Sequence, residues 1–331
     1  MGFAAATAAL GVLVAVAFAV GRFPVTPAEL LTVLWAKLSG TPHTLPPTIE
    51  TVVFRVRGPR VLAAMAVGAT LAASGSAYQG LFRNPLVSPD LLGVSSGAAL
   101  GAVLGIYFSL GVAAIQAFAF AGGLVAVAVV YALGASLRRH DPTLVLVLAG
   151  VVIGTLLGSC VALIKYLADP YNQLPAITFW LLGSLAGVTL SDVLAVLPAV
   201  GLGLVPLVLL RWRLNLMTLG EDEARALGVD TRRLRTVVVA AATLMTAAVV
   251  SISGVIGWIG LLVPHLARLL VGPDFGRLLP AALLLGAGYL LGVDTLARTL
   301  ARIEIPLGVL TAFLGTPLFI WLLAAGRRGW P

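Results

Sequence analysis

The 25 residues from position 112 to position 136 read VAAIQAFAFAGGLVAVAVVYALGAS and carry no charged side chain. An α-helix rises about 1.5 Å per residue and the hydrocarbon core of a bilayer is about 30 Å thick, so roughly 20 apolar residues cross it. This stretch is therefore long enough to span a membrane as one helix. A strand of a membrane β-barrel would alternate apolar with polar side chains, and this stretch does not.

Nine further stretches have the same character, and we predict ten transmembrane helices in all. They lie at 3–20, 61–81, 92–108, 112–136, 143–167, 190–210, 235–253, 256–271, 279–297 and 307–325. With 60% hydrophobic and 10% charged residues and a mean hydropathy of +1.07, the chain cannot be a water-soluble domain. The predicted fold is an all-α polytopic membrane protein that forms a single transmembrane domain over residues 1–331.

Three features bear on other classes of protein. The first stretch lacks the basic residues that begin a secretory signal, and Gly21-Arg22-Phe23-Pro24 is a poor cleavage site, so we predict a retained helix. Cys160 is the only cysteine, which excludes an intramolecular disulfide and a cysteine metal cluster. The net charge of +8 is explained by anionic lipid and by basic cytoplasmic loops, so no nucleic-acid partner is predicted.

The basic residues also predict the orientation, because basic loops are retained on the cytoplasmic side during insertion. With ten spans and both termini in the cytoplasm, thirteen of the 21 Lys and Arg residues fall on that side and eight fall outside. The outer group includes Arg22, and the cytoplasmic group includes Arg138, Arg139, Arg327 and Arg328.

Between the fifth and sixth spans, the segment from Asp169 to Pro175 breaks the helix, and the apolar run that follows is too short to cross a membrane. We predict a half-helix at 175–187 on the outer side. A re-entrant gate and an interfacial helix with Trp180 among the headgroups are both compatible with this pattern.

A charged block interrupts the apolar chain at 211–235. Its centre, from Leu219 to Asp230, reads LGEDEARALGVD, with Gly220 and Gly228 at the two ends of a predicted short helix. Ala224 and Leu227 lie three residues apart and would share an apolar face opposite an acidic one. Such a helix can dock into a groove on a soluble partner, although an ordinary solvated loop has a similar composition.

The stretch from Gly254 to Arg268 reads GVIGWIGLLVPHLAR and places a proline within an apolar helix. Pro264 must interrupt the hydrogen-bond ladder. His265 follows it, but no second histidine, cysteine or carboxylate pair has ligand spacing, so we predict no metal site and a structural hydrogen bond instead. Small residues at 93–105 and 286–292 predict helices that pack closely.

Three ordered motifs resemble the signatures of the FecCD-type permeases. These are RNPLVSPDLLG from Arg83, the stretch ending in PHLAR at Arg268, and EIPLGVLTAFLGTP from Glu304. The resemblance runs from about Arg57 to Leu323, with Trp258-Ile259 in place of the usual Phe-Val pair. Motif residues that we expect to be structural are Arg83, Asn84, Pro85, Gly93, Gly257, Pro264, His265, Arg268, Pro306, Gly315 and Pro317.

The resemblance implies the membrane subunit of a type II ATP-binding-cassette importer in the bacterial inner membrane. Its partners would be a second copy of the chain, two cytoplasmic ATPase subunits and a periplasmic binding protein. ATP and magnesium would bind the ATPase, because this chain has no phosphate-binding loop. We therefore predict no catalytic residue and no cofactor on the chain itself.

The same resemblance assigns two contact regions. The charged block would hold the coupling helices, with Gly220, Glu221, Ala224, Leu227 and Gly228 in a groove of the ATPase. Arg57 and Arg60 of the RGPR motif and Arg298 would bind carboxylates of the binding protein. Arginine suits that role because its planar fork matches a carboxylate, although arginines at a helix end can also simply anchor it among headgroups.

Two other classes of protein fit the sequence less well. A secondary transporter needs ionisable groups deep in its spans, whereas Lys165, Asp294 and Glu304 lie near the predicted outer ends. An intramembrane enzyme needs a nucleophile with its base or a metal set, and none is suitably spaced. The cargo that the resemblance favours is a ferric siderophore, with cobalamin, haem and molybdate or tungstate as alternatives.

Overall fold

The computed structural model describes residues 2–21, 23–136 and 142–325, and within these ranges it is helical without strands. Both chain ends and the five arginines named for the orientation lie outside the described residues. Helices occupy all ten predicted ranges. They are α1 (Phe3–Ala19), α4 (Gly58–Phe82), α5 (Val94–Tyr107), α6 (Val112–Ser136), α7 (Pro142–Leu167), α9 (Leu190–Leu209), α12 (Thr231–Ser253), α13 (Ile259–Val271), α14 (Phe275–Thr299) and α15 (Leu307–Ala325).

Six helical segments of the described chain are long and apolar enough to cross a membrane: the segment 47–82 that ends with α4, and α6, α7, α9, α12 and α14. The chain is therefore a multi-pass membrane protein. Helices α1, α5, α13 and α15 are apolar but shorter by the same measure. The number ten remains a prediction, because a helix of fewer than about 20 residues crosses a bilayer only where the bilayer thins or flanking side chains reach its surface.

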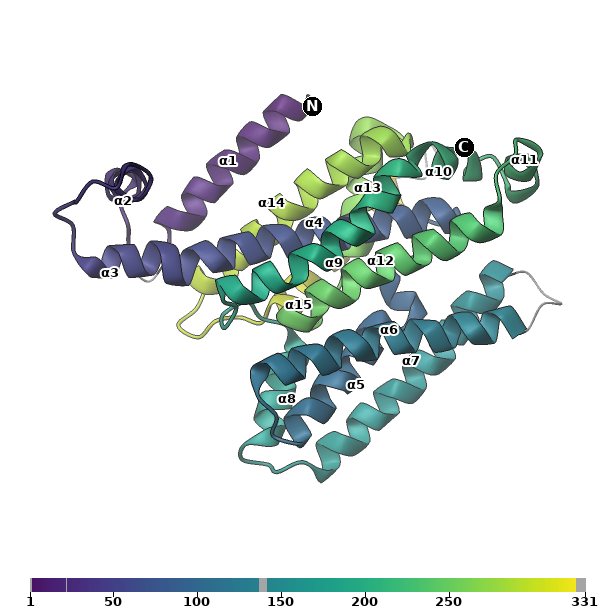
Figure 1. Cartoon of the computed structure of the whole chain (residues 1–331), viewed down its shortest axis with the longest axis horizontal. Helices are drawn as coiled ribbons and strands as arrows, with labels where there is room; N and C mark the ends of the chain where they lie inside the picture. Colours follow the sequence, from purple (N-terminus) through teal and green to yellow (C-terminus); the bar gives the residue numbers. More distant parts are fainter. Residues whose placement is uncertain (1, 22, 137–141, 326–331) are drawn as a thin grey trace.

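Helices α4, α12 and α14 form the centre of the bundle (Figure 1). Of the 18 residues that make up the apolar stretch of each helix, 78% are buried in α4 and in α12, whereas only 22% are buried in α6, α7 and α9. Helices α5 and α6 pack against each other along their length, with α7 beside both. The central helices face protein on most sides, and the outer ones present apolar side chains to their surroundings.

The central helices meet at glycines, as their small-residue content predicts. A β-carbon on Gly68 of α4 would lie 2.1 Å from the carbonyl oxygen of Gly286 of α14. In α5 and α6, Gly97 and Gly122 approach each other in the same way. Lipid provides no hydrophobic drive between helices, so close backbone contact of this kind supplies the dispersion energy that holds them together.

Pro264 has a specific packing consequence within α13. A proline has no N–H, so the carbonyl of Gly260, four residues earlier, loses its partner in the helix ladder. That carbonyl lies against Gly75 of α4, where a β-carbon would come within 1.9 Å of its oxygen. The helix continues through Pro264 to Val271, so the predicted interruption removes one hydrogen bond without ending the helix.

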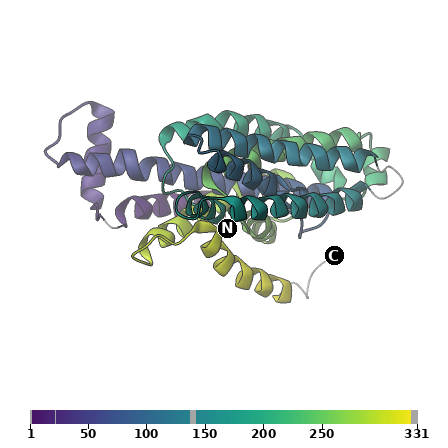
Figure 2. The ribbon, with the colours of Figure 1, turned by 90° about the horizontal axis from the view of Figure 1, so that it is seen from below.

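Four short helical elements lie near the end of the bundle where α4 begins and α14 ends, two of them within the segment 47–82 (Figures 1 and 2). They are α2 (Pro27–Ser39), α3 (Pro47–Glu50), the π-helix η1 (Thr51–Arg57) and α8 (Gln173–Leu182). The half-helix predicted at 175–187 has other bounds in the structure: α8 begins two residues earlier and ends at Leu182, before Gly183. Gly183 has a φ of 72° and terminates the helix, because a left-handed residue cannot continue it.

At the opposite end of the bundle lie α10 (Arg211–Met217) and α11 (Glu221–Ala226). The short helix η2 (Pro89–Leu92) packs further inside, against α7 and α13. The charged block and the predicted outer half-helix are thus at opposite ends of the spans, as the predicted orientation requires.

The glycine contact between α4 and α13 generates a prediction. Gly75→Ala places a β-carbon against backbone that cannot move aside, and we expect a loss of about 3 kcal/mol, the upper range for overpacking. Gly80→Ala is the matched control in the same helix, because no atom lies within 4 Å of its added carbon. Thermal unfolding in detergent should show a much lower Tm for Gly75→Ala alone; equal melting of the two variants would contradict the packing described.

Candidate functional site

The charged block is anchored to the bundle through α10. The Asn215 side chain accepts a hydrogen bond from the backbone N–H of Phe275 at 2.7 Å and donates one to Asp274 at 2.7 Å. Leu214 and Met217 of α10 are buried against the core. Residues 60 positions apart are therefore joined, and α10 is fixed to the beginning of α14.

Helix α11 is held in place by an ion-pair cluster centred on Glu221. Its carboxylate pairs with Arg225 at 2.6 Å and with Arg235 of α12 at 2.8 Å, and it also accepts a hydrogen bond from Thr231. Partial burial raises the pKa of Glu221, but the charges and hydrogen bonds of these partners outweigh that effect and leave the pKa below its ordinary value. Glu221 is thus an anion that ties α11 to the start of α12.

The prediction that Ala224 and Leu227 share an apolar face of α11 is wrong. Ala224 is fully buried against the bundle, but Leu227 follows the last helical turn and is 59% exposed. The two side chains therefore do not share a face. Gly220 and Gly228, with φ of 141° and 83°, begin and end the segment in conformations that other residues avoid. Leu227 is left as an apolar side chain on the outside of the block.

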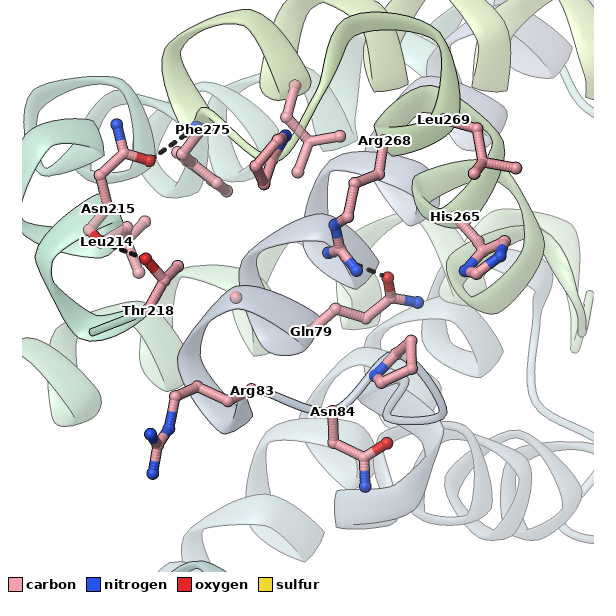
Figure 3. Close-up of a pocket in the computed structure, with 14 residues that line it drawn as sticks. Gln79, Arg83, Asn84, Leu214, Asn215, Thr218, His265, Arg268, Leu269 and Phe275 are labelled. Carbon is pink, nitrogen blue, oxygen red and sulfur yellow. Dashed lines mark hydrogen bonds between the residues drawn. The ribbon is translucent and has the colours of Figure 1, made fainter. Parts of the chain in front are cut away.

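Two of the sequence motifs meet beside α10 in a cavity of about 430 Å³ (Figure 3). It is lined by the end of α4, the turn at Arg83-Asn84-Pro85, α10, and the part of α13 that carries His265 and Arg268. Arg268 donates to the side chain of Gln79 at 3.3 Å, and the Gln79 amide donates to the carbonyl of Leu261 at 3.0 Å. Gln79, which sequence reasoning did not single out, therefore links α4 to α13 at the proline-containing turn.

The turn after α4 is shaped by its own residues. Arg83 ends the helix with a φ of 49°, and its side chain points away from the cavity (Figure 3). The Asn84 side chain accepts a hydrogen bond from the N–H of Leu86 at 2.9 Å, which forms a local turn. Gly93 supplies the left-handed residue that starts α5. These residues form the turn that leads from α4 towards α5.

At the opposite end of the bundle the three predicted docking arginines lie together. Arg60 pairs with Asp294 at 2.8 Å and with Glu304 at 2.5 Å. Arg298 donates to the carbonyl of Ala17 at 2.8 Å and lies 3.5 Å from Asp294. Three cations and two carboxylates form one cluster between α4, α14 and the segment that leads into α15.

Arg57 extends the cluster to the end of α1. It donates hydrogen bonds to the carbonyls of Phe18 and Phe23, and its side chain is buried. Cations beside the last carbonyls of a helix are favourable because the macrodipole is negative there. All three arginines therefore have partners within the chain, and their contact with a binding protein stays a prediction.

The third motif lies against the segment between α12 and α13. Pro306 precedes α15, and Gly315 faces Trp258, whose side chain would lie 2.9 Å from an added β-carbon. Trp258 has a φ of 73° and its ring makes an edge contact with Phe319 at 6.2 Å. Gly257 and Pro317 line the apolar cavity of about 710 Å³ beside this contact. The departure at Trp258 is thus accommodated by a glycine on α15.

The fold, the charged block and the motif turns together point to a membrane permease. A profile of the FecCD transport family matches residues 9–325, and the chain belongs to this family of ABC importer permeases. Members of the class are transport subunits and not enzymes, and they work with ATPase and binding-protein partners.

Two relatives and one solved structure illustrate the similarity. The molybdate import system permease protein MolB of Haemophilus influenzae is 39% identical over 98% of this chain and 95% of its own length. The cobalamin import system permease protein BtuC of Halobacterium salinarum is 42% identical over 84% of this chain and 75% of its own. An inward-facing putative metal-chelate type ABC transporter has 37% identity, a TM-score of 0.88 and 98% coverage of both chains.

The arginine cluster leads to a prediction about stability. Asp294→Asn removes the fully buried partner of Arg60, and breaking a buried pair in this way costs about 3 kcal/mol. Glu304→Gln is the matched control, since its side chain is 29% exposed and water can replace part of the interaction. Thermal unfolding in detergent should rank Asp294→Asn well below Glu304→Gln; the reverse order would mean that Glu304 is the main partner.

The pKa of Glu221 leads to a prediction about pH. Because the folded pKa is lowered, the stability from this carboxylate is complete above the ordinary glutamate value of about 4.3 and is lost as pH falls through the lower folded value. Glu221→Gln should therefore reduce Tm at pH 7, and the difference from wild type should shrink below about pH 4. Asp222→Asn, at a 94% exposed side chain, should leave Tm unchanged at both pH values.

Proposed function

We propose that the chain is one half of a homodimeric importer permease whose translocation path lies between the two copies, and that its cargo is a metal chelate delivered by a periplasmic binding protein. The observation that carries the proposal is the family match over nearly the whole chain. The position of the charged block, with α10 and α11 at the end of the bundle opposite the start of α4, supports it. The homodimer rests on the resemblance of the sequence motifs. The proposed location is the bacterial inner membrane, with both termini cytoplasmic.

Helix α11 is the proposed contact with the ATPase. It is fixed to α12 through Glu221 and to α14 through α10, so it cannot move without those helices. Leu227 offers an exposed apolar side chain to a groove of the partner. Movement of the ATPase subunits would then tilt the spans and open the path to each side in turn, provided that ATP binds the two states with different affinity.

Arg57, Arg60 and Arg298 are the proposed contact with the binding protein. In the described structure Arg57 and Arg298 hold carbonyl oxygens at the end of α1. A carboxylate is a stronger acceptor for a guanidinium than a neutral carbonyl is. Docking would therefore exchange these partners for carboxylates of the binding protein while Arg60 keeps its own.

For the cargo, we propose a ferric siderophore, because it is the commonest cargo in the family that the motifs resemble. A second candidate is a metal oxyanion, because the molybdate permease MolB matches this chain over 98% of its length. The two differ in size and charge, so a direct comparison separates them.

The experiment that tests this function uses the permease reconstituted in liposomes with its ATPase and binding protein. We expect ATP hydrolysis to rise several-fold with one loaded form of the binding protein from a panel of ferric siderophore, cobalamin, haem, molybdate and tungstate. A response to molybdate alone would replace the siderophore proposal, and failure to associate with any ATPase would contradict the importer.

A variant of the charged block tests in the same experiment whether Leu227 contacts the ATPase. Leu227→Asp should abolish association with the ATPase and stimulated hydrolysis, because it places a charge in the proposed apolar contact. Leu300→Asp, with the same 59% exposure just after α14, is the matched control for association with the ATPase. Stimulated hydrolysis is not compared for this control, because Leu300 lies beside Arg298 of the proposed binding-protein contact. Unchanged association of Leu227→Asp would exclude this side chain from the interface.

A further inference from the structure

Helix α2 is a well-defined element that the prediction of spans did not include. Thr26 and Glu29 form a capping box at its first turn, in which Glu29 accepts the backbone N–H of Thr26 at 2.7 Å. Pro27 occupies the first helical position, and Gly40 ends the helix with a φ of 69°. Both ends are thus specified locally, and α2 has a fixed length of 13 residues.

One side of α2 packs on its own small core. Leu30 and Val33 are 8% and 1% exposed and lie against Val25, Ile49 and Val53. This cluster is separate from the main core of the bundle and joins α2 to α3 and η1. The orientation of α2 about its axis is therefore fixed by these buried contacts.

A second apolar side of α2 is exposed. Leu31, Trp35 and Leu38 are 67%, 69% and 84% exposed, and Leu34 between them is 37% exposed. Residues at these spacings fall on one stripe, because a helix completes a turn every 3.6 residues. Thr32 and Ser39 lie outside the stripe and are also exposed. The helix therefore has a packed face, an uncovered apolar stripe and a polar face.

The direction of α2 differs from that of the spans. Figure 1 looks along its axis, and Figure 2, turned by 90°, shows it crossing the long direction of the bundle. It lies beyond the start of α4, at the end of the molecule that carries the arginine cluster. A helix at the end of a membrane bundle that runs across the spans runs along the plane of the bilayer.

We propose that α2 is an interfacial helix whose stripe of Leu31, Leu34, Trp35 and Leu38 is buried in the lipid surface at that end of the bundle. Amphipathic helices in this position bury their apolar side to a depth of about 5–10 Å at the boundary between headgroups and acyl chains. Trp35 suits the site, since tryptophan is enriched at membrane interfaces. The long stem of Lys37 reaches over the ring of Phe54 at 5.6 Å and leaves its charge at the edge of the helix.

A lipid surface explains the stripe better than a protein partner does. A stable protein interface uses roughly 20–30 residues on each side, whereas the stripe has four side chains. The spans already place lipid beside the bundle, so burial of the stripe requires no additional partner. The interface would fix the height of the connection between α1 and α4, and with it the arginine cluster that follows it.

The test measures depth in the bilayer with single fluorophores. In a Cys160→Ser background, Leu31→Cys and Leu38→Cys are labelled with an environment-sensitive dye, and Thr32→Cys is the matched control on the polar side of the same helix. In phosphatidylcholine nanodiscs we expect blue-shifted emission at 31 and 38 and several-fold stronger quenching by brominated lipid than at 32. Quenching that is equal at the three positions would overturn the proposal.

Two additions guard against misleading variants. Brominated lipid should also quench the intrinsic tryptophan fluorescence of the unlabelled wild type more than that of Trp35→Phe. This difference reports on the native stripe without a label. If instead positions 31 and 38 become shielded only when the periplasmic binding protein is added, the stripe is a protein contact and the lipid proposal is wrong.

Discussion

The contact on which the structure depends is the approach of α4 to α13 and α14 at glycine residues. Gly68 meets Gly286, and Gly75 meets the carbonyl of Gly260, to which Pro264 cannot donate the usual helical hydrogen bond. In a membrane no hydrophobic force draws these helices together, so their association depends on how closely the backbones can approach. Replacing hydrogen by a methyl group at either position would separate the central helices along their length.

The central pair of helices connects the two ends of the molecule. Helix α4 begins beside Arg57 and Arg60 and ends beside the cavity that contains Gln79 and Arg268, while α14 runs in the opposite direction. Each end is held by polar contacts between residues far apart in sequence. Because α10 is hydrogen-bonded to the start of α14, a displacement of α10 would be passed along α14 to the arginine cluster at its other end. These contacts are the physical basis for the coupling that we propose between the ATPase and the docking arginines.

Charge within the bundle has a structural explanation. Asp294 is fully buried and is the kind of residue that in a secondary transporter would bind the coupling ion, but here it is paired with Arg60. Glu304 belongs to the same cluster. Because a buried carboxylate is costly unless it is paired, the cluster holds these helix ends together. Asp294 is therefore a structural ion-pair partner, which favours an importer permease over an ion-coupled secondary transporter.

The sequence by itself determined the ten helical ranges, the charged block at 211–235 and the family, because length, apolar content, charge and motif order are local properties. It missed α2, since a 13-residue helix with a capping box is too short to register as a span. Only the tertiary structure decided that Leu227 faces outward while Ala224 is buried, and that Arg60 already has carboxylate partners. These outcomes depend on contacts between residues up to 244 positions apart, which no local pattern encodes.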